Sequence, residues 1–294
     1  MDNSRYESDS LSKPDSTLLQ GENSPNTRDD ASSPGEQKVS SEKRIAIVET
    51  FGPTIQGEGP LAGSKTMFVR FGGCDYRCGR CDSLHAVIPS AVKANSRYLT
   101  AAQVAEELIP KAQATGTKWV VFSGGNPCMW DLTELVQILH SNGICVSVET
   151  QGTLAPSWLQ RCDLVVVSPK APGMGEKFEP EKLESFVYSV RQAFVPIALK
   201  VVIFTAQDIE WALQMQSIAQ VQAGMMYMSL GNDRPPPLKD DNTLDTSQNH
   251  ADHVMHLLSC YRMTIEDLLV DPRIVDWKFL PQLHVLVWGN EAEK

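Results

Sequence analysis

From Arg44 onward the sequence alternates short apolar runs with longer segments of helical periodicity, and this alternation limits the fold more than any other feature. The runs "KWVVFSGG" and "IALKVVIF" are almost continuously apolar, as expected of strands buried on both faces. The stretch "TAAQVAEELIPKAQATG" opens on an N-cap residue, Thr100, and closes at Gly116, which is typical of a helix. The alternation predicts an α/β fold with a parallel sheet covered by helices. About six such strands are visible, fewer than the eight of a closed barrel, so we expect a partial, open TIM-like barrel.

The first 42 residues differ in composition from the rest of the chain. They are rich in Ser, Asp, Glu, Asn and Pro and hold only scattered apolar residues. Such a segment cannot bury enough apolar surface to offset its ordering entropy. We therefore expect a disordered, acidic, Ser-rich tail over 1–42 and a folded domain over 43–294.

Charge and cysteine content narrow the class of function. The formal net charge of −10 argues against a general affinity for nucleic-acid phosphates. The chain has seven cysteines, an odd number, and four of them are scattered through apolar or mixed segments, which predicts a reducing, cytoplasmic location. No apolar run approaches the ~20 residues that span a bilayer, so we expect no membrane association.

Three cysteines gather in "GGCDYRCGRCDS", where Cys74, Cys78 and Cys81 have C-x3-C-x2-C spacing directly after an apolar strand. Parallel α/β folds keep their chemistry at such carboxyl ends of strands. Three thiolates suit a [4Fe–4S] cluster that keeps one iron free for a substrate or cofactor. They also suit a structural zinc ion with His85 as its fourth ligand. The spacing alone does not decide between the two metal sites.

The ends of other predicted strands favour the cluster. Small and polar residues follow three of them, in "SGGNP" (123–127), "ETQGT" (149–153) and "SPK" (168–170). All three would meet the cysteines at one rim of the sheet. Glycine pairs at such a rim let a ligand approach the backbone closely, which a structural zinc site does not require.

With these motifs in place, the chain resembles the radical S-adenosylmethionine (SAM) superfamily and, within it, the 7-carboxy-7-deazaguanine synthase family. The resemblance extends from about Ile45 to Gly289, and its most specific part is a Gln-Gly-Glu-Gly loop ahead of the cysteines. The matching segments are "TIQGEGPLAGSKTMFVRFGGCDYRCGRCDS", "SGGNP", "VETQGT", "SPK", "LKVVI" and "QLHVLVWG".

The resemblance implies a radical SAM fold with a C-terminal substrate-binding segment, and a lyase that cleaves SAM reductively. The resulting 5′-deoxyadenosyl radical would take hydrogen from carbon 6 of 6-carboxy-5,6,7,8-tetrahydropterin. Ring contraction with loss of ammonia would then give 7-carboxy-7-deazaguanine, a precursor of queuosine and other deazapurines. The implied cofactors are a [4Fe–4S] cluster, SAM and Mg²⁺. The implied partners are a reductant such as flavodoxin and a second copy of the chain.

The resemblance also implies roles for individual residues, none of them as a catalytic side chain. The cluster would be held by Cys74, Cys78 and Cys81, and Mg²⁺ by the hydroxyl of Ser83. The residues implied in substrate binding are Ile55, Gln56, Gly57, Arg70, Ser123 and His284. Those implied in SAM binding are Gly125, Ser168, Pro169, Lys170, Ser229, Leu230, Gly231 and Asn232. Glu58 is a further candidate for the substrate loop.

Two positions depart from the pattern. Asn126 stands where most radical SAM enzymes have a Glu that accepts a hydrogen bond from the SAM amino group, and an amide oxygen accepts without charge assistance. Ser83 stands where many members have Thr, and this exchange retains the hydroxyl.

Two alternative functions remain for the chain. One is another radical SAM enzyme, such as an activase or one with a different substrate, and the other is a zinc-stabilised binding protein.

Overall fold

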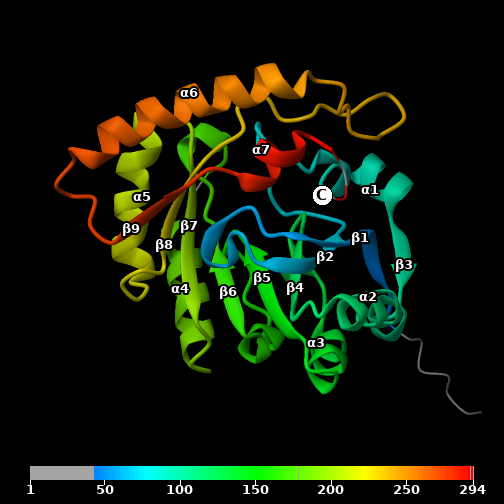
Figure 1. Ribbon diagram of the computed structural model, residues 1–294. Coiled ribbons are helices and arrows are strands. Elements are labelled where there is room, and N and C mark those ends of the chain that lie inside the picture. The colour runs from blue at the N-terminus through cyan, green and yellow to red at the C-terminus, as the bar shows by residue number, and fades with distance from the viewer. Residues whose placement is uncertain (1–42, 178, 292, 294) are drawn as a thin grey trace, which may run out of the picture. The chain divides into compact units, whose positions relative to one another are not determined.

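The computed structural model describes residues 43–177, 179–291 and 293, and the predicted tail over 1–42 lies outside these ranges (Figure 1). The described part forms one open sheet with the strand order β3-β1-β2-β4-β5-β6-β7-β8-β9. The strands are β1 (Ile45–Ile55), β2 (Lys65–Phe71), β3 (Arg97–Leu99), β4 (Trp119–Gly124), β5 (Cys145–Thr150), β6 (Leu164–Val167), β7 (Ile197–Ile203), β8 (Met226–Leu230) and β9 (Trp277–Leu280).

The pairing confirms a mostly parallel α/β sheet and extends the expected strand count. Within the described ranges, every pair from β2 through β4 to β9 is parallel, which makes seven parallel strands rather than about six. At the other edge, β1 is antiparallel to both β2 and β3. The two outer strands, β3 and β9, are not paired with each other, so the barrel stays open as expected.

The helices follow the strands along the chain. They are α1 (Pro89–Asn95), α2 (Ala101–Thr115), α3 (Thr133–Ser141), α4 (Pro180–Arg191), α5 (Ala206–Ala219), α6 (His250–Leu269) and α7 (Leu283–Trp288). The predicted boundaries of α2 are confirmed: Thr100 forms a capping box with Gln103, and Gly116 ends the helix at a φ of +64°. No helix in the ranges that the structure describes is long and apolar enough to span a membrane.

Alternation along the strands separates the two faces of the sheet. In β6, Val165 and Val167 pack into the main core beneath α2, α3, α4 and α5, whereas Leu164 and Val166 join a small apolar cluster on the opposite face. In β7, Leu199 likewise faces the main core. Because side chains alternate along a strand, Lys200 points away from those helices, toward the inside of the open barrel.

The end of the chain corrects one expectation. The apolar pattern of "LPQLHVLVWG" predicts a strand that closes the fold, but the segment contains the helix α7, and the last strand, β9, ends on its first residue, Leu280. The physical reason is local, because a short apolar run suits a strand or a buried helical turn equally well. Here Gly289, at a φ of +63°, donates its N–H to the carbonyl of Val285 and ends the helix.

Candidate active site

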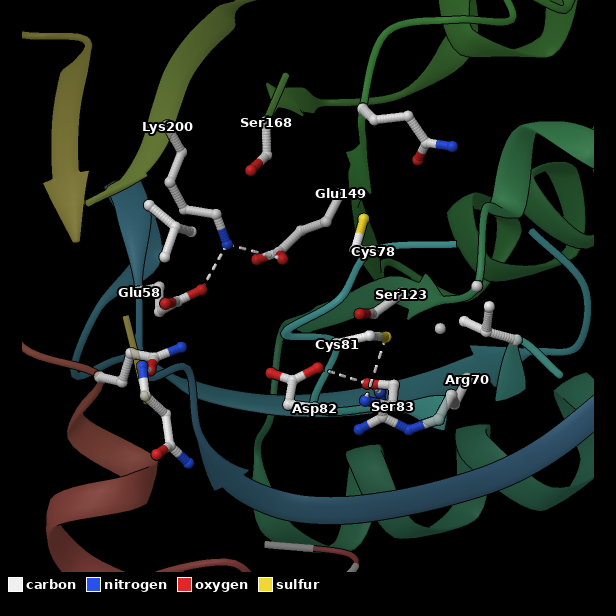
Figure 2. Close-up of a pocket in the computed structure, with 18 of the residues that line it drawn as sticks. Glu58, Arg70, Cys78, Cys81, Asp82, Ser83, Ser123, Glu149, Ser168 and Lys200 are labelled. Carbon is white, nitrogen blue, oxygen red and sulfur yellow. Dashed lines mark hydrogen bonds and ion pairs between the residues drawn. The ribbon is translucent and has the colours of Figure 1, made fainter. Parts of the chain in front are cut away.

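One cavity lies inside the open barrel and takes its walls from the ends of successive strands (Figure 2). It brings together most of the residues predicted from the sequence, including every predicted substrate and metal residue. Those lining it are Ile55, Gln56, Gly57, Arg70, Cys74, Cys78, Cys81, Ser83, Ser123, Gly125, Ser168, Lys170, Asn232 and His284. Four predicted SAM residues do not line it, namely Pro169, Ser229, Leu230 and Gly231.

Local structure explains these four placements. Pro169 is buried between two lining residues. Ser229 is fully buried within the β8 ladder. Leu230 lines a small apolar cavity next to α6 and α7 instead. A Cβ atom at Gly231 would lie 2.2 Å from the ring of Phe204, so this glycine is required by close packing.

The cysteine loop leaves β2 and presents three reduced thiols to the cavity. The sulfurs of Cys74 and Cys81 each accept a backbone N–H at 3.4 Å, from Tyr76 and Ser83. Burial raises the pKa of Cys78 to about 11 and that of Cys81 to about 12. Such thiols become thiolate ligands when the charge of a bound metal displaces their protons.

The donor set fits a cluster with an open iron better than a zinc site. Three thiols lie on one loop, and no fourth cysteine is among the described residues that line the cavity. Within the described ranges, no group of three or more His, Cys, Asp or Glu side chains is arranged to hold a single metal ion. His85, the fourth ligand of the zinc alternative, contacts Glu49 at 3.1 Å and does not line the cavity.

Arg70 is held at the cavity wall by ionic and polar contacts on both sides. Its Nε donates to Glu49 at 2.8 Å, and its guanidinium also donates to the Ser83 hydroxyl at 2.8 Å. That hydroxyl donates in turn to Asp82 at 2.7 Å. Burial favours the protonated form of Asp82, but Arg70 and Ser83 outweigh it and lower the pKa. This series of hydrogen bonds aligns a cation, a hydroxyl and a carboxylate at one side of the cavity (Figure 2).

The opposite side of the cavity holds a buried lysine between two glutamates (Figure 2). Lys200 donates to Glu58 at 2.5 Å and to Glu149 at 2.9 Å. Glu149 also accepts from the side-chain amide of Gln56 at 2.7 Å. Gln56 comes from the Gln-Gly-Glu-Gly loop, so three separate parts of the chain meet here.

The C-terminal segment closes over that loop. Leu283 donates its backbone N–H to Gly57 at 3.1 Å, and Gln282 accepts the backbone N–H of Asn232 at 2.7 Å. A Cβ at Gly57 would lie 2.0 Å from Nδ1 of His284. The absence of a side chain at Gly57 is therefore what lets His284 reach the cavity.

Asn126, which departs from the radical SAM pattern, is completely buried. Its amide oxygen accepts from the N–H of Cys128 at 3.2 Å and from the hydroxyl of Thr150 at 3.0 Å. Its amide nitrogen donates to Asp75 of the cysteine loop at 2.8 Å. Asn126 thus ties the loop to β4 and β5, a role that the sequence comparison with Glu did not suggest.

Sequence reasoning gave no role to several charged residues of the site. Arg80, Asp82, Glu149 and Lys200 line the cavity, and Glu49 pairs with Arg70. A signal was available for Lys200, because a single lysine interrupts the apolar strand "IALKVVIF". Glu49 lies in "IAIVETF", and an acid in such an edge-like strand is usually solvated, so the sequence offered no signal for its contact with Arg70.

Comparison with curated proteins places this chain among related sequences. It is 36% identical over 249 residues to the 7-carboxy-7-deazaguanine synthase of Bacillus cereus, covering 84% of this chain and 98% of that protein. It is also 36% identical over 253 residues to the synthase of Bacillus subtilis, covering 85% of this chain and 98% of that one. No family model matches the chain.

Among solved structures, the fold is similar to that of QueE from Escherichia coli. The TM-score is 0.53 at 22% sequence identity, and the match covers 82% of this chain and 95% of that one. At this identity the similarity supports the open-barrel fold.

Proposed function

This chain belongs to the 7-carboxy-7-deazaguanine synthase family, and we propose that it converts 6-carboxy-5,6,7,8-tetrahydropterin to 7-carboxy-7-deazaguanine. The reaction is a SAM-dependent radical ring contraction with loss of ammonia, in the biosynthesis of queuosine and other 7-deazapurines. The observation that carries the proposal is that the cysteine loop, Arg70, Ser83 and His284 line one cavity. The sequence match to the Bacillus cereus synthase also covers nearly all of that protein.

The cysteine loop is suited to hold the cluster through Cys74, Cys78 and Cys81. When bound, a [4Fe–4S] cluster supplies the electron that cleaves SAM. The lining residues Gly125, Ser168, Lys170 and Asn232 are the proposed SAM contacts, with Pro169 shaping the segment between two of them. A Cβ at Gly125 would lie 1.9 Å from the carbonyl oxygen of Gly73, so the strand end and the cysteine loop must meet backbone to backbone.

The substrate would be oriented by the side of the cavity that holds Arg70. A guanidinium matches the planar carboxylate of the pterin with a fork of N–H donors. Ser83, beside it, offers a hard oxygen ligand to Mg²⁺, which keeps several waters in most protein sites. Gln56 and His284 reach the cavity from the substrate loop and the C-terminal segment. Ser123, Ile55 and the backbone of Gly57 complete the proposed substrate contacts.

Three wider proposals follow the family. The enzyme is proposed to act in the cytoplasm, to receive electrons from a reductant such as flavodoxin, and to form a homodimer. The exposed apolar side chains of α6 support the last of these, because a dimer contact would cover them. They include Met255, Leu258, Met263 and Leu269. Sedimentation velocity of the purified protein measures this directly, and a monomer at micromolar concentration would exclude the dimer.

The test of the activity is a reconstituted reaction. The cluster is rebuilt anaerobically and reduced, SAM, Mg²⁺ and 6-carboxytetrahydropterin are added, and 7-carboxy-7-deazaguanine is sought by mass spectrometry. Product that depends on all three cysteines supports the proposal. SAM cleavage without this product would leave a radical SAM enzyme with a different substrate.

A further inference from the structure

Lys200 lies where an unpaired charge would be costly. Lys200 is only 3% exposed to solvent. It lies in the middle of β7, on the inner face of the sheet. Its ammonium contacts Glu58 at 2.5 Å and Glu149 at 2.9 Å, and Figure 2 shows the three side chains converging from different elements. Burial of one cation between two carboxylates leaves the group with one net negative charge beside the cavity.

We propose that Lys200 is a positioning residue for the substrate, because its ammonium holds the Glu58 and Glu149 carboxylates close together as acceptors for the N–H groups of the pterin ring. This inference rests on the proposed function, since it assigns the group to the same cavity and substrate.

The acceptor capacity of the group supports this assignment. Oε1 of Glu58 is buried and makes no hydrogen bond to any described residue, although Glu58 lines the cavity. A buried carboxylate oxygen without a donor is destabilising, and an N–H of a bound ligand would remove that cost. The 2-amino-4-oxo ring of a pterin presents several N–H groups along one edge. Its carboxylate would then face Arg70, on the other side of the cavity.

Electrostatics explains why the lysine is needed. Two carboxylates in one buried site disfavour each other's ionisation unless a cation lies between them. Burial alone would raise the pKa of Glu58, but Lys200, aided by His284, outweighs it and lowers the pKa, against a weaker opposing effect of Asp82. Burial likewise opposes protonation of Lys200, yet the two glutamates raise its pKa. The remaining charged residues that line the cavity outside the cysteines are Arg70, Arg80 and Lys170.

A purely structural ion pair is the competing explanation, and pH dependence separates the two. Without the ammonium, one of the paired carboxylates takes up a proton at a pH where both are ionised in the wild type. It then donates to its neighbour and no longer accepts from the ring. Ligand affinity should therefore fall as pH is lowered, whereas for a purely structural ion pair the ligand affinity of the folded variant would not follow the ionisation of these carboxylates.

The experiment compares Lys200→Met with the wild type, both carrying the reconstituted cluster with SAM and Mg²⁺ under anaerobic conditions. The probe is 6-carboxypterin, a stable fluorescent relative of the substrate, and equilibrium dialysis gives its Kd between pH 6 and pH 8. Because His284 is present in both proteins, the readout is the ratio of the two Kd values. We expect K200M to bind about 10- to 100-fold more weakly at pH 7, the range for lost hydrogen bonds to charged groups, and the ratio to grow as pH falls.

Two further variants sharpen the test. Lys43→Met breaks an exposed ion pair with Asp131, outside the cavity, and should leave the Kd unchanged. The double variant K200M/E58Q leaves one carboxylate in the group and removes the like-charge repulsion, so its Kd ratio to wild type should change less with pH than the ratio for K200M. It also serves if K200M alone does not fold, since the like-charge repulsion is gone.

The outcomes are distinct. A ratio near one for K200M, or a ratio that is constant across pH, would overturn the positioning role. A Kd ratio for K200M/E58Q that depends on pH as steeply as the ratio for K200M would refute the paired-carboxylate explanation. If the wild type itself does not bind 6-carboxypterin, the proposed substrate falls, and the inference falls with it.

Discussion

Replacing Glu49 by Gln tests whether the carboxylate behind Arg70 stabilises the site by its charge. Glu49 bridges Arg70 at 2.8 Å and His85 at 3.1 Å, and its side chain is 13% exposed. Burial favours its protonated form, but His85 and Arg70 outweigh burial and lower the pKa from 4.5 to about 2. The amide of Gln keeps the shape of the side chain and removes the charge.

The magnitude follows from the change in pKa. Each tenfold change in the dissociation constant is worth about 1.4 kcal/mol, so the ionised form of Glu49 contributes about 3 kcal/mol to folding at neutral pH. Because the folded pKa is the lower one, this contribution is complete above pH 4.5 and is lost as the pH falls toward 2. At pH 3 less than half of it, about 1.4 kcal/mol, should remain.

The assay is urea unfolding of the cluster-free protein, followed by tryptophan fluorescence at pH 7, 4 and 3. The measured quantity is the difference in unfolding free energy between wild type and E49Q, in which the other titrating groups largely cancel. We expect this difference to be near 3 kcal/mol at pH 7 and to shrink by more than half at pH 3. Glu210→Gln, which breaks an exposed pair with Arg273, is the matched control and should change stability much less. A difference for E49Q that is small, or the same at all three pH values, would refute the reasoning.

Three further substitutions test the cavity. Gly57→Ala places a Cβ 2.0 Å from Nδ1 of His284, so we expect a higher KM for the pterin with little change in iron content, and an unchanged KM would contradict the close approach. Arg70→Lys keeps the charge but loses the fork of donors, so steady-state kinetics should show a KM raised about 10- to 100-fold; a KM near that of the wild type would remove Arg70 from carboxylate binding. Ser83→Ala should raise the Mg²⁺ concentration needed for half-maximal rate whereas Ser83→Thr should not, and equal Mg²⁺ titrations would exclude the hydroxyl as a ligand.

The sequence predicted those parts of the molecule whose signals are local. The capping residues Thr100 and Gly116 fix the ends of α2 through contacts within a few residues. The cysteine spacing and the glycine-containing strand ends place their residues at one rim, because parallel strands all end on the same side of a sheet. These local rules recovered the fold class and brought most of the predicted residues to one cavity.

The contacts that could not be predicted join residues far apart in the sequence. Lys200 and Glu58 are separated by 142 positions, and Asn126 and Asp75 by 51. Nothing in either local sequence states which partner the fold will supply. The helix α7 was not predicted for a different reason, because a run of six mostly apolar residues does not distinguish a strand from a helical turn.

The two charged sides of the cavity carry opposite charge, and this difference would affect the orientation in which the substrate binds. Arg70 presents a cation with open hydrogen-bond donors, whereas Glu58 and Glu149 around Lys200 carry a net negative charge and an unfilled acceptor. A ligand with a carboxylate at one end and N–H groups at the other is bound favourably in one orientation and repelled at both ends in the reverse one. The cysteine loop lines the same cavity between these sides (Figure 2), so a fixed orientation also fixes which carbon faces the cluster end. If the substrate binds as we propose, selection of carbon 6 depends on the charges at both ends of the cavity, and a variant that neutralises one end should bind the ring with less regiospecificity before it loses SAM cleavage.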